Sequence, residues 1–352
     1  MNARDISFAS FNLYNLQVPG RPMYRGRTYD QGEYDEKIAW TAAQLKGLDA
    51  DVIAFQELWS GEALEAAFAA AGLTDSYRLV YIGDTAWYNV AVAAAIRRPW
   101  ELRDRRAHKQ VPAELKLVKH ELDPGTGDQA DDDDDDVDVT IDVFSRTILE
   151  LAIGHGDLDE VPPMTVFCCH LKSKLAMKFA AVDYENHPMI EGFEAPLGAA
   201  LSTIRRTAEA AGLRILLDKR MDDNHDPVVV LGDLNDGTLS NTLQILTRQP
   251  SYRLSIKSRT GRQSEKGLYT AAQLDQLRSF RDVNFSHSHH EIPEVIDHVL
   301  VSDAFYDASI HRKWSFRDMR ILTDHINPHV KGGAASDHGL VRAAFDWNPA
   351  EV

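Results

Sequence analysis

Six short segments of the chain share one format, in which an apolar, strand-like run ends in polar side chains. In an α/β fold, side chains from distant segments meet over one pocket at the ends of strands. An Asp, Asn, Glu or His at such an end therefore places a polar group on a shared rim. The six segments are Phe11-Asn12, Phe55-Gln56-Glu57, His170-Leu171-Lys172-Ser173, Gly232-Asp233-Leu234-Asn235, Ile296-Asp297-His298 and Ser336-Asp337-His338.

Each of these patterns also has a structural interpretation when it is taken alone. Glu57 could serve as the acid at the N-terminus of a helix that begins just after it. Asp233 and Asn235 follow a glycine and could form an Asx-type turn. His298 follows Asp297 along a strand and should face away from it, so we expect a packed structural histidine there. The joint occurrence of the patterns in this order is what favours a common site.

In this order the patterns resemble the endonuclease/exonuclease/phosphatase superfamily, which includes deoxyribonuclease I, apurinic endonucleases, sphingomyelinases and inositol polyphosphate 5-phosphatases. The resemblance spans Phe11 to Phe345, and its most specific part is the combination of Gly-Asp-x-Asn, Ile-Asp-His and Ser-Asp-His. The segments 170–174 and 232–236 are most similar to those of bacterial DNA-degrading members. The resemblance implies a four-layer α/β sandwich, with two mixed β-sheets packed face to face and helices on both outer sides.

The resemblance also implies a site for a divalent cation and a cationic contact to phosphate. Asn12 and Glu57 would help to hold the metal, with Asp337 near it on the opposite side. Hard oxygen ligands of this kind suit Mg²⁺ or Mn²⁺, with Ca²⁺ as a further candidate. Arg146, in the segment Phe-Ser-Arg-Thr-Ile-Leu, resembles the phosphate-contacting arginine that begins a central strand in this superfamily.

The same resemblance assigns the acid–base and phosphate-binding roles. It makes Asp233 the residue that orients or deprotonates the attacking water, with Asn235 beside it on the phosphate. His170 and His338 would face the phosphate, and Asp297 would form a hydrogen bond with His338. Hydrolysis of a phosphodiester places negative charge on oxygen atoms, so positioning and electrostatic stabilisation dominate catalysis. Whether Asp233 or the Asp297–His338 pair takes the proton stays open.

The charge of the chain bears on the substrate. The net charge is −16, which weakens an interpretation as a nucleic-acid binder. Ten of the acids lie between Asp123 and Asp142, however, and without them the charge is about −6. The six consecutive aspartates at 131–136 repel one another, so we predict an acidic flexible loop at 123–136. No repeat or long linker divides the chain, which predicts a single catalytic domain over residues 1–352.

Other features of the sequence bear on the compartment. No apolar run approaches the length needed to cross a bilayer, so no membrane partner is expected. The N-terminus lacks the basic and apolar regions of a signal peptide, which favours a cytoplasmic protein, while a signal removed earlier stays an alternative. Cys168 and Cys169 are neighbours in a strand-like run and should point to opposite faces, unbridged.

Strand-like and helical patterns alternate along the chain. Strands are predicted at 6–13, 51–56, 77–82, 89–97, 137–153, 164–169, 227–231, 295–301, 310–316 and 340–345. Helices are predicted at 33–48 and 62–71, and a long third helix should have Leu201, Ile204, Ala208, Ala211 and Ile215 on its apolar face.

Three functional hypotheses follow. The leading one is a divalent-metal nuclease that hydrolyses DNA phosphodiester bonds. The second keeps the same site but acts on a small phosphoester or a lipid headgroup, as a phosphatase or phospholipase-type phosphodiesterase. The third is a binding protein that has kept only the fold. The sequence leaves open endonuclease against exonuclease action, DNA against RNA, and the oligomeric state.

Several segments outside the six patterns bear on these hypotheses. Arg21, Arg25 and Arg27, together with a basic segment at 253–266, are candidate grips for phosphate, or else ordinary loop charges. The stretch 172–196 could form a substrate-side flap, a dimer contact or a solvated loop. The histidine cluster at 286–290 suggests a metal site, but its alternation beside a strand favours an exposed strand face.

Overall fold

Two six-stranded β-sheets form the centre of the structure, a computed structural model that describes residues 3–83, 90–119, 137–222, 224–248, 267–278, 285–289, 292–326 and 334–350. The first sheet contains, in spatial order, β15 (Trp314–Leu322), β16 (Leu340–Trp347), β1 (Ile6–Leu16), β2 (Val52–Leu58), β4 (Ala91–Arg97) and β3 (Tyr77–Tyr81). The second contains β11 (Tyr269–Thr270), β14 (Asp297–Val301), β10 (Val228–Asp233), β9 (Met164–His170), β8 (Val143–His155) and β5 (Trp100–Gln110). The acidic segment predicted as a loop and the basic segment 253–266 lie outside the described residues.

Both sheets are mixed in the same way. The central pairs β1–β2 and β9–β10 are parallel, and the other described neighbours are antiparallel. Because parallel neighbours end at the same edge of a sheet, each central pair brings two strand ends together. This arrangement positions most of the predicted site.

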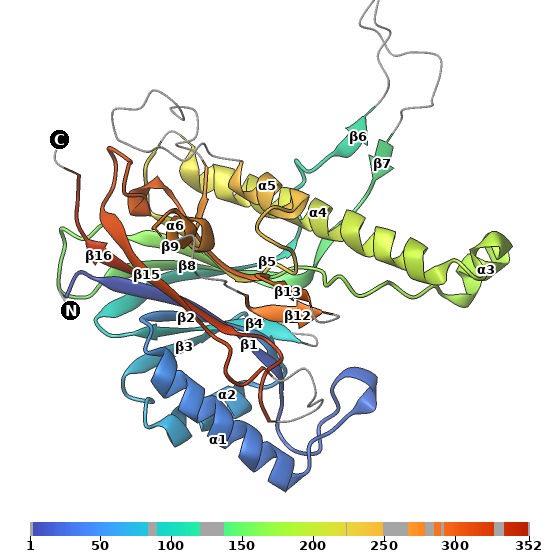
Figure 1. Ribbon diagram of the computed structural model, residues 1–352, viewed down its shortest axis with the longest axis horizontal. Coiled ribbons are helices and arrows are strands. Elements are labelled where there is room, and N and C mark those ends of the chain that lie inside the picture. The colour runs from blue at the N-terminus through green and yellow to red at the C-terminus, as the bar shows by residue number, and fades with distance from the viewer. Residues whose placement is uncertain are drawn as a thin grey trace, which may run out of the picture.

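Helices cover both outer faces of the paired sheets, as Figure 1 shows. The first sheet is covered by α1 (Gln31–Leu48) and α2 (Gly61–Ala71), and the second by α4 (Glu194–Met221) and α5 (Asn241–Thr247). The predicted four-layer sandwich is therefore confirmed. The shorter elements are η1 (Tyr24–Gly26), β6 (Leu117–Lys119), β7 (Val137–Val139), α3 (Ala181–Asn186), η2 (Pro188–Ile190), α6 (Ala271–Arg278), β12 (His287–His289), β13 (Ile292–Glu294) and η4 (Asp303–Phe305).

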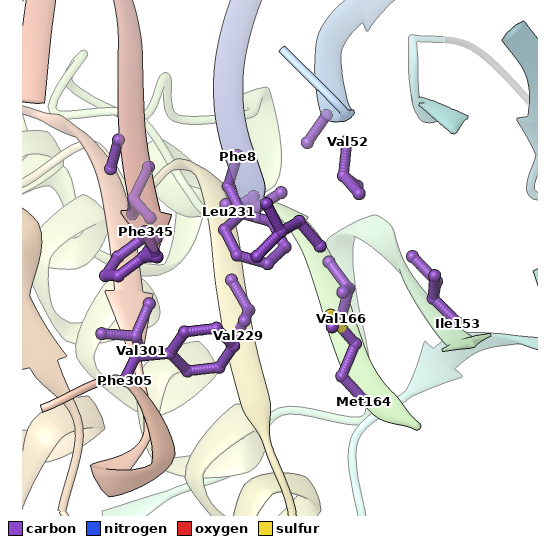
Figure 2. Close-up of a cluster of buried hydrophobic side chains, with 14 of the residues drawn as sticks. Phe8, Val52, Ile153, Met164, Val166, Val229, Leu231, Val301, Phe305 and Phe345 are labelled. Carbon is purple, nitrogen blue, oxygen red and sulfur yellow. The ribbon is translucent and has the colours of Figure 1, made fainter. Parts of the chain in front are cut away.

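Three apolar clusters fill the spaces between the layers, and β10 contributes to two of them. Val229 and Leu231 belong to the cluster between the sheets, whereas Val228 and Val230 belong to the cluster under α4 and α5. Figure 2 shows part of the first cluster, in which side chains from both sheets point toward one another. Since consecutive residues of a strand face opposite sides, a strand buried on both faces needs a continuous apolar run.

The first helix begins at Gln31, two residues before the predicted start, and ends at Leu48 as predicted. Asp30 caps α1, because its side chain accepts a hydrogen bond from the backbone N–H of Glu33, whose own side chain accepts from the N–H of Asp30. The apolar residues Ile38, Ala42 and Leu45, spaced at helical intervals, are buried against the first sheet.

The buried face predicted for the long helix α4 is wrong over its first half. Leu201 and Ile204 are 42% and 43% exposed, because this part of α4 projects beyond the sheets with α3 at its tip (Figure 1). The buried face instead includes two charged residues: Arg206 pairs with Asp236 at 3.1 Å, and the Glu209 carboxylate accepts backbone hydrogen bonds. Among the described residues no helix is apolar and long enough to cross a membrane.

Three strand predictions also need correction. The strand predicted at 310–316 begins only at Trp314, after a turn that places the Ser309 N–H on the carbonyl of Tyr306. The strand predicted at 137–153 is two strands, β7 and β8. The edge strand β5 was not predicted, because charged residues on an exposed edge give no apolar alternation.

Candidate active site

Four of the predicted residues lie where the parallel strand pairs β1–β2 and β9–β10 end, at one end of the sandwich. In the first sheet Asn12 of β1 is in register with Gln56, and Glu57 follows directly. In the second sheet Asp233 of β10 is in register with His170 of β9. The two sheets meet there, since the Asn12 amide donates a hydrogen bond of 3.2 Å to the Asp233 carboxylate.

The antiparallel neighbours of these strands begin where the parallel strands end. Asp297 begins β14 and lies directly opposite Asp233. His338 precedes β16, and the Ser336 hydroxyl ties its loop to β1 by a hydrogen bond of 2.9 Å to the Asn12 carbonyl. The six predicted segments therefore converge on one site, as the sequence predicted.

His338 lies between two buried carboxylates. Its Nδ1 donates to Asp297 Oδ2 at 2.8 Å, and its Nε2 is 3.9 Å from Asp233 Oδ2. Burial lowers the pKa of His338, but the negative charges of Asp297 and Asp233 outweigh it and hold the pKa well above the usual value. The ring is therefore an imidazolium at neutral pH, with Nε2–H directed at the site.

Asp233 occupies the centre of the site and is 1% exposed. Its Oδ1 accepts a hydrogen bond of 2.9 Å from the Asn235 backbone, and its Oδ2 lies 3.6 Å from His170 Nε2. Burial and the charge of Asp297 raise the pKa of Asp233 to about 7, against the lowering effect of His338. A carboxylate with such a pKa can accept and release a proton at neutral pH.

The other side of the site carries groups that suit a phosphate. Burial, together with the nearby charge of Arg146, lowers the pKa of His170, so this ring is neutral. The carbonyl of Leu171 accepts hydrogen bonds from Arg146 at 3.3 Å and from the Asn235 side chain at 3.1 Å. His170, Asn235 and Arg146 are thus held together around the end of β9.

Glu57 and Asp337 provide the oxygen donors predicted for a metal. Burial raises the pKa of Glu57, and the negative charge of Asp337 raises it further, against His338. Asp337 is exposed, whereas Glu57 is half-buried. Two neighbouring carboxylates that repel each other can bind a divalent cation, whose positive charge would stabilise both negative charges. The Asn12 amide oxygen accepts the Tyr14 N–H at 2.9 Å and keeps one lone pair for a metal.

Lys37 lies close to Glu57 and Asp337, although no pattern in the sequence pointed to it. It is 1% exposed, and its Nζ has no hydrogen-bond partner among the described residues. The ammonium lies over the rings of Tyr14 and Trp40 at 5.5 and 5.6 Å. Burial lowers the pKa of Lys37 to about 8, opposed by the charges of Glu57 and Asp337. No sequence signal could have found it, since a lysine in a helix is ordinarily a solvated residue.

Two further histidines, His287 and His298, differ in how well the sequence predicted them. The prediction of an exposed strand face at 286–290 is wrong for His287, which is half-buried with its ring centroid 4.9 Å from that of His338. His298 is the packed structural histidine that was predicted: it is buried, and its Nε2 donates to the Asp236 carbonyl at 2.9 Å.

Comparisons with known proteins show the family of the chain and the fold that it shares with solved structures. The model of the endonuclease/exonuclease/phosphatase family matches residues 9–338. A family member from Bacteroides thetaiotaomicron has a similar structure, with a TM-score of 0.54 and 12% identity over 97% of this chain and 94% of that one. A mannosyl-6-phosphatase from the same species gives 0.55 and 12% over 97% and 100% of the two chains. Truncated TDP2 from Caenorhabditis elegans gives 0.52 and 11% over 97% of each. No curated protein matches the chain.

The fold and the site define a class of hydrolases that act on phosphoester bonds and generally depend on a divalent metal. The chain belongs to the endonuclease/exonuclease/phosphatase family, because the family model covers nearly all of it. This family includes nucleases, phosphodiesterases and phosphatases. At identities of 11–12% the similar structures establish the fold alone.

Proposed function

We propose that the protein is a divalent-metal-dependent phosphodiesterase that hydrolyses DNA. The observation that supports this most strongly is the position of Asp233. It lies within 4 Å of Asn12, His170 and His338 while Glu57 and Asp337 flank the same site. A proton acceptor beside two imidazoles and a pair of cation-binding carboxylates is the set that hydrolysis of a phosphodiester requires.

Asn12, Glu57 and Asp337 would hold Mg²⁺ or Mn²⁺. When bound, such an ion supplies positive charge against the oxygens of the phosphate. Asp233 takes the proton of the attacking water. Its pKa of about 7 makes it a stronger base than an ordinary aspartate, yet one that is half deprotonated at neutral pH. Asn12 orients this carboxylate through its amide hydrogen bond.

The remaining residues stabilise the charge that develops on the phosphate. His338 donates from Nε2, and Asp297 keeps its ring protonated and fixed. His170, Asn235 and Arg146 contribute neutral and cationic donors from the other side. Donors that are already in place need no reorganisation during the reaction, which is the largest electrostatic advantage of an enclosed site.

DNA as the substrate is supported by the basic segment after β1. Arg21, Arg25 and Arg27 are exposed around η1, and the charge of Arg27 reaches Tyr14 and Lys37 at the metal side. A duplex that contacts these side chains would release counterions, so activity should fall steeply with added salt.

A second candidate is a phosphatase that acts on a small phosphomonoester. The net charge of −16 favours it, because an acidic surface repels a polyanion. Lys174, which follows the His170 segment, forms ion pairs with Glu294 at 2.6 Å and with Asp236 at 3.6 Å. Its charge is therefore less available to DNA. The similar fold of a mannosyl-6-phosphatase is compatible with this candidate.

One assay separates the two candidates and tests both. The protein and its His338→Ala variant are incubated with supercoiled plasmid, linear duplex, single-stranded DNA, RNA, a sugar phosphate and sphingomyelin. Each is tested with Mg²⁺, Mn²⁺, Ca²⁺ or chelator. We expect metal-dependent cleavage of DNA that falls by about 10²–10³-fold in the variant. Turnover of the sugar phosphate alone would replace the nuclease with the phosphatase, and cleavage unaffected by the substitution would show that the site is wrong.

A further inference from the structure

His287 lies at the active site although it belongs to none of the six predicted segments. Its ring centroid is 4.9 Å from that of His338, with an angle of 41° between the rings. It is carried by the hairpin of β12 and β13, in which it pairs with Glu294. Figure 1 shows this hairpin at the end of the sandwich from which the α3 segment projects.

Ser286 fixes the hairpin to both sides of the site. Its hydroxyl accepts hydrogen bonds of 3.0 Å from the backbone N–H groups of Ile296 and Asp297. Its carbonyl accepts the N–H of Gly339, the residue after His338, at 2.6 Å. The backbone of His287 is therefore tied to the segment of Asp297 and to the loop of His338, so the imidazole is held where it lies.

Together with two neighbours, His287 has the geometry of a metal site. His287, Asp337 and His338 each offer one ligand atom, and the three atoms lie within 4.8 Å of one another. Tetrahedral Zn²⁺ with bonds of about 2.0–2.1 Å needs ligand atoms about 3.4 Å apart. The separation of His338 Nε2 and Asp337 Oδ1 is 4.0 Å, and a rotation of the exposed Asp337 side chain would close the difference.

The orientation of His338 also suits a metal ligand, once the incoming cation has displaced the proton from Nε2. Because Nδ1 donates to the Asp297 carboxylate at 2.8 Å, only Nε2 is left to face a cation. A carboxylate that orients a histidine through its other nitrogen is the usual support of a metal-bound imidazole. Two imidazoles and one carboxylate favour Zn²⁺ and similar transition metals over Mg²⁺, which prefers oxygen ligands. This set therefore differs in chemistry from Asn12 and Glu57.

We propose that His287, Asp337 and His338 form an inhibitory site for a transition-metal ion, with Zn²⁺ as the best-fitting example. The binding part of the proposal depends only on these three side chains. The inhibitory part rests on the proposed function, because Zn²⁺ on Nε2 of His338 would remove the hydrogen-bond donor that faces the phosphate. It would also draw Asp337 away from the Mg²⁺ ligands.

Binding is tested first, without any substrate. Zn²⁺ is titrated into the full chain by calorimetry, and Co²⁺ is followed by its visible absorption. The variants are His287→Asn, His287→Gln and the control His187→Asn, which changes an exposed histidine beyond α3. We expect the two His287 variants to bind Zn²⁺ about 100-fold more weakly and to lose the Co²⁺ band. Circular dichroism of the metal-free variants checks that they fold.

The same variants then test inhibition. Hydrolysis supported by Mg²⁺ is measured with rising Zn²⁺, and each variant is compared with its own rate without Zn²⁺. We expect the concentration of Zn²⁺ for half inhibition to rise about 100-fold in the His287 variants and to stay unchanged in the control. Equal Zn²⁺ affinity in all variants would overturn the proposed site. Binding of Zn²⁺ through Asp233, Asp297 and His338, the second possible ligand group among the described residues, would overturn it as well. Absence of any Mg²⁺-supported hydrolysis would refute the proposed function instead, and the binding result would still decide the site.

Discussion

The two ends of β2 carry acidic residues in opposite circumstances: Asp51 is buried and Glu57 is half-buried. Just before the strand, the carboxylate of Asp51 accepts hydrogen bonds from the Ser7 N–H and hydroxyl at 2.8 and 2.6 Å, and from the Arg97 guanidinium at 3.0 and 2.7 Å. Near the other end, Glu57 has a left-handed φ of 57° and a carboxyl whose pKa is raised by burial. The hydrogen bonds of the Asp51 carboxylate join three strands. The negative charge of Glu57, by contrast, is disfavoured by burial, and a bound cation would stabilise it.

Left-handed φ angles occur near both ends of β2, at Asp49 close to Asp51 and at several residues around the site. Tyr14, Asn15, Glu57 and Asn235 all have positive φ at the site end, a conformation that costs about 1 kcal/mol or more for residues other than glycine. Buried polar atoms without a partner also gather there, including His170 Nδ1 and Asp297 Oδ1 among the described residues. The site end is therefore organised for a ligand and the Asp51 end for stability, and substitutions at the two ends should separate these properties.

The largest effect is expected for Asp233→Asn. The amide cannot accept the proton of water, so kcat should fall by about 10³–10⁴-fold. The melting temperature should not fall, because a buried carboxylate is replaced by a neutral group of the same shape. Steady-state kinetics on the DNA substrate and thermal melting measure the two quantities. Substantial remaining activity would assign the proton to the Asp297–His338 pair.

Glu57→Gln should affect the metal more than the fold. We expect kcat/KM to fall by about 10²–10³-fold and Mg²⁺ binding to weaken in calorimetry, since one charged ligand is lost. The metal-free variant should be at least as stable as the original, because burial disfavours the carboxylate. A loss of stability with normal metal binding would mean that Glu57 is a structural acid like Asp51.

Asp51→Ala should reverse this pattern. Removal of the carboxylate takes two hydrogen bonds from the Arg97 guanidinium, which keeps its ion pair with Asp49, and one from the Ser7 hydroxyl, and should lower the free energy of unfolding by about 2 kcal/mol. Urea denaturation measures this change. At temperatures where the variant is folded, kcat should equal that of the original protein, and a large fall in kcat would show that the two ends of β2 are not independent.

Asp297→Asn should change the pH dependence of the reaction. Asp297 raises the pKa of His338, so the imidazolium persists to higher pH in the original protein. Without that charge the pKa falls, the ring loses its proton at lower pH, and the alkaline limb of kcat/KM should move down by about one pH unit or more. The acidic limb of the same pH profile reflects the titration of Asp233. It should not shift to higher pH, because the loss of the negative charge of Asp297 lowers the pKa of Asp233. An unmoved alkaline limb would mean that His338 is not the protonated group.

The smallest effect is expected for Lys37→Met. The buried ammonium repels a cation beside Glu57 and Asp337, so its removal should tighten Mg²⁺ binding by roughly five-fold. Methionine fills the same space between Tyr14 and Trp40. Calorimetry measures the affinity, with Lys46→Met in the last turn of α1 as the control. Weaker binding in the Lys37 variant would show that the lysine positions the ligands instead of repelling the ion.

The sequence was sufficient for the layers and for most of the site, because both depend on local patterns. Asp233 and His170 each end an apolar run, and a parallel pair of strands places such ends together. Lys37 and His287 could not be predicted in the same way. Lys37 is buried because α1 packs over the end of β1 that carries Tyr14, and His287 reaches the site through a hairpin fixed by Ser286. Both depend on tertiary contacts between distant segments, which no spacing in the sequence records.

The exposed half of α4 failed prediction for a related reason. Leu201 and Ile204 have the spacing of a buried face, but this part of the helix lies beyond the sheets, and the chain around Leu175 and Met177 covers a different face, that of Gly198 and Ser202. Apolar spacing predicts which face of a helix could be buried, and the length of the neighbouring sheet decides where burial ends.

The central claim is that the ends of distant strands make one cation-and-phosphate site. Anomalous diffraction from crystals of the full chain soaked in Mn²⁺ tests it most directly. We predict a peak about 2.2 Å from a carboxylate oxygen of Glu57, with Asp233 and His338 lining the same cavity. A peak only at other residues, or a Glu57 side chain directed away from Asp233 and His338, would contradict the account.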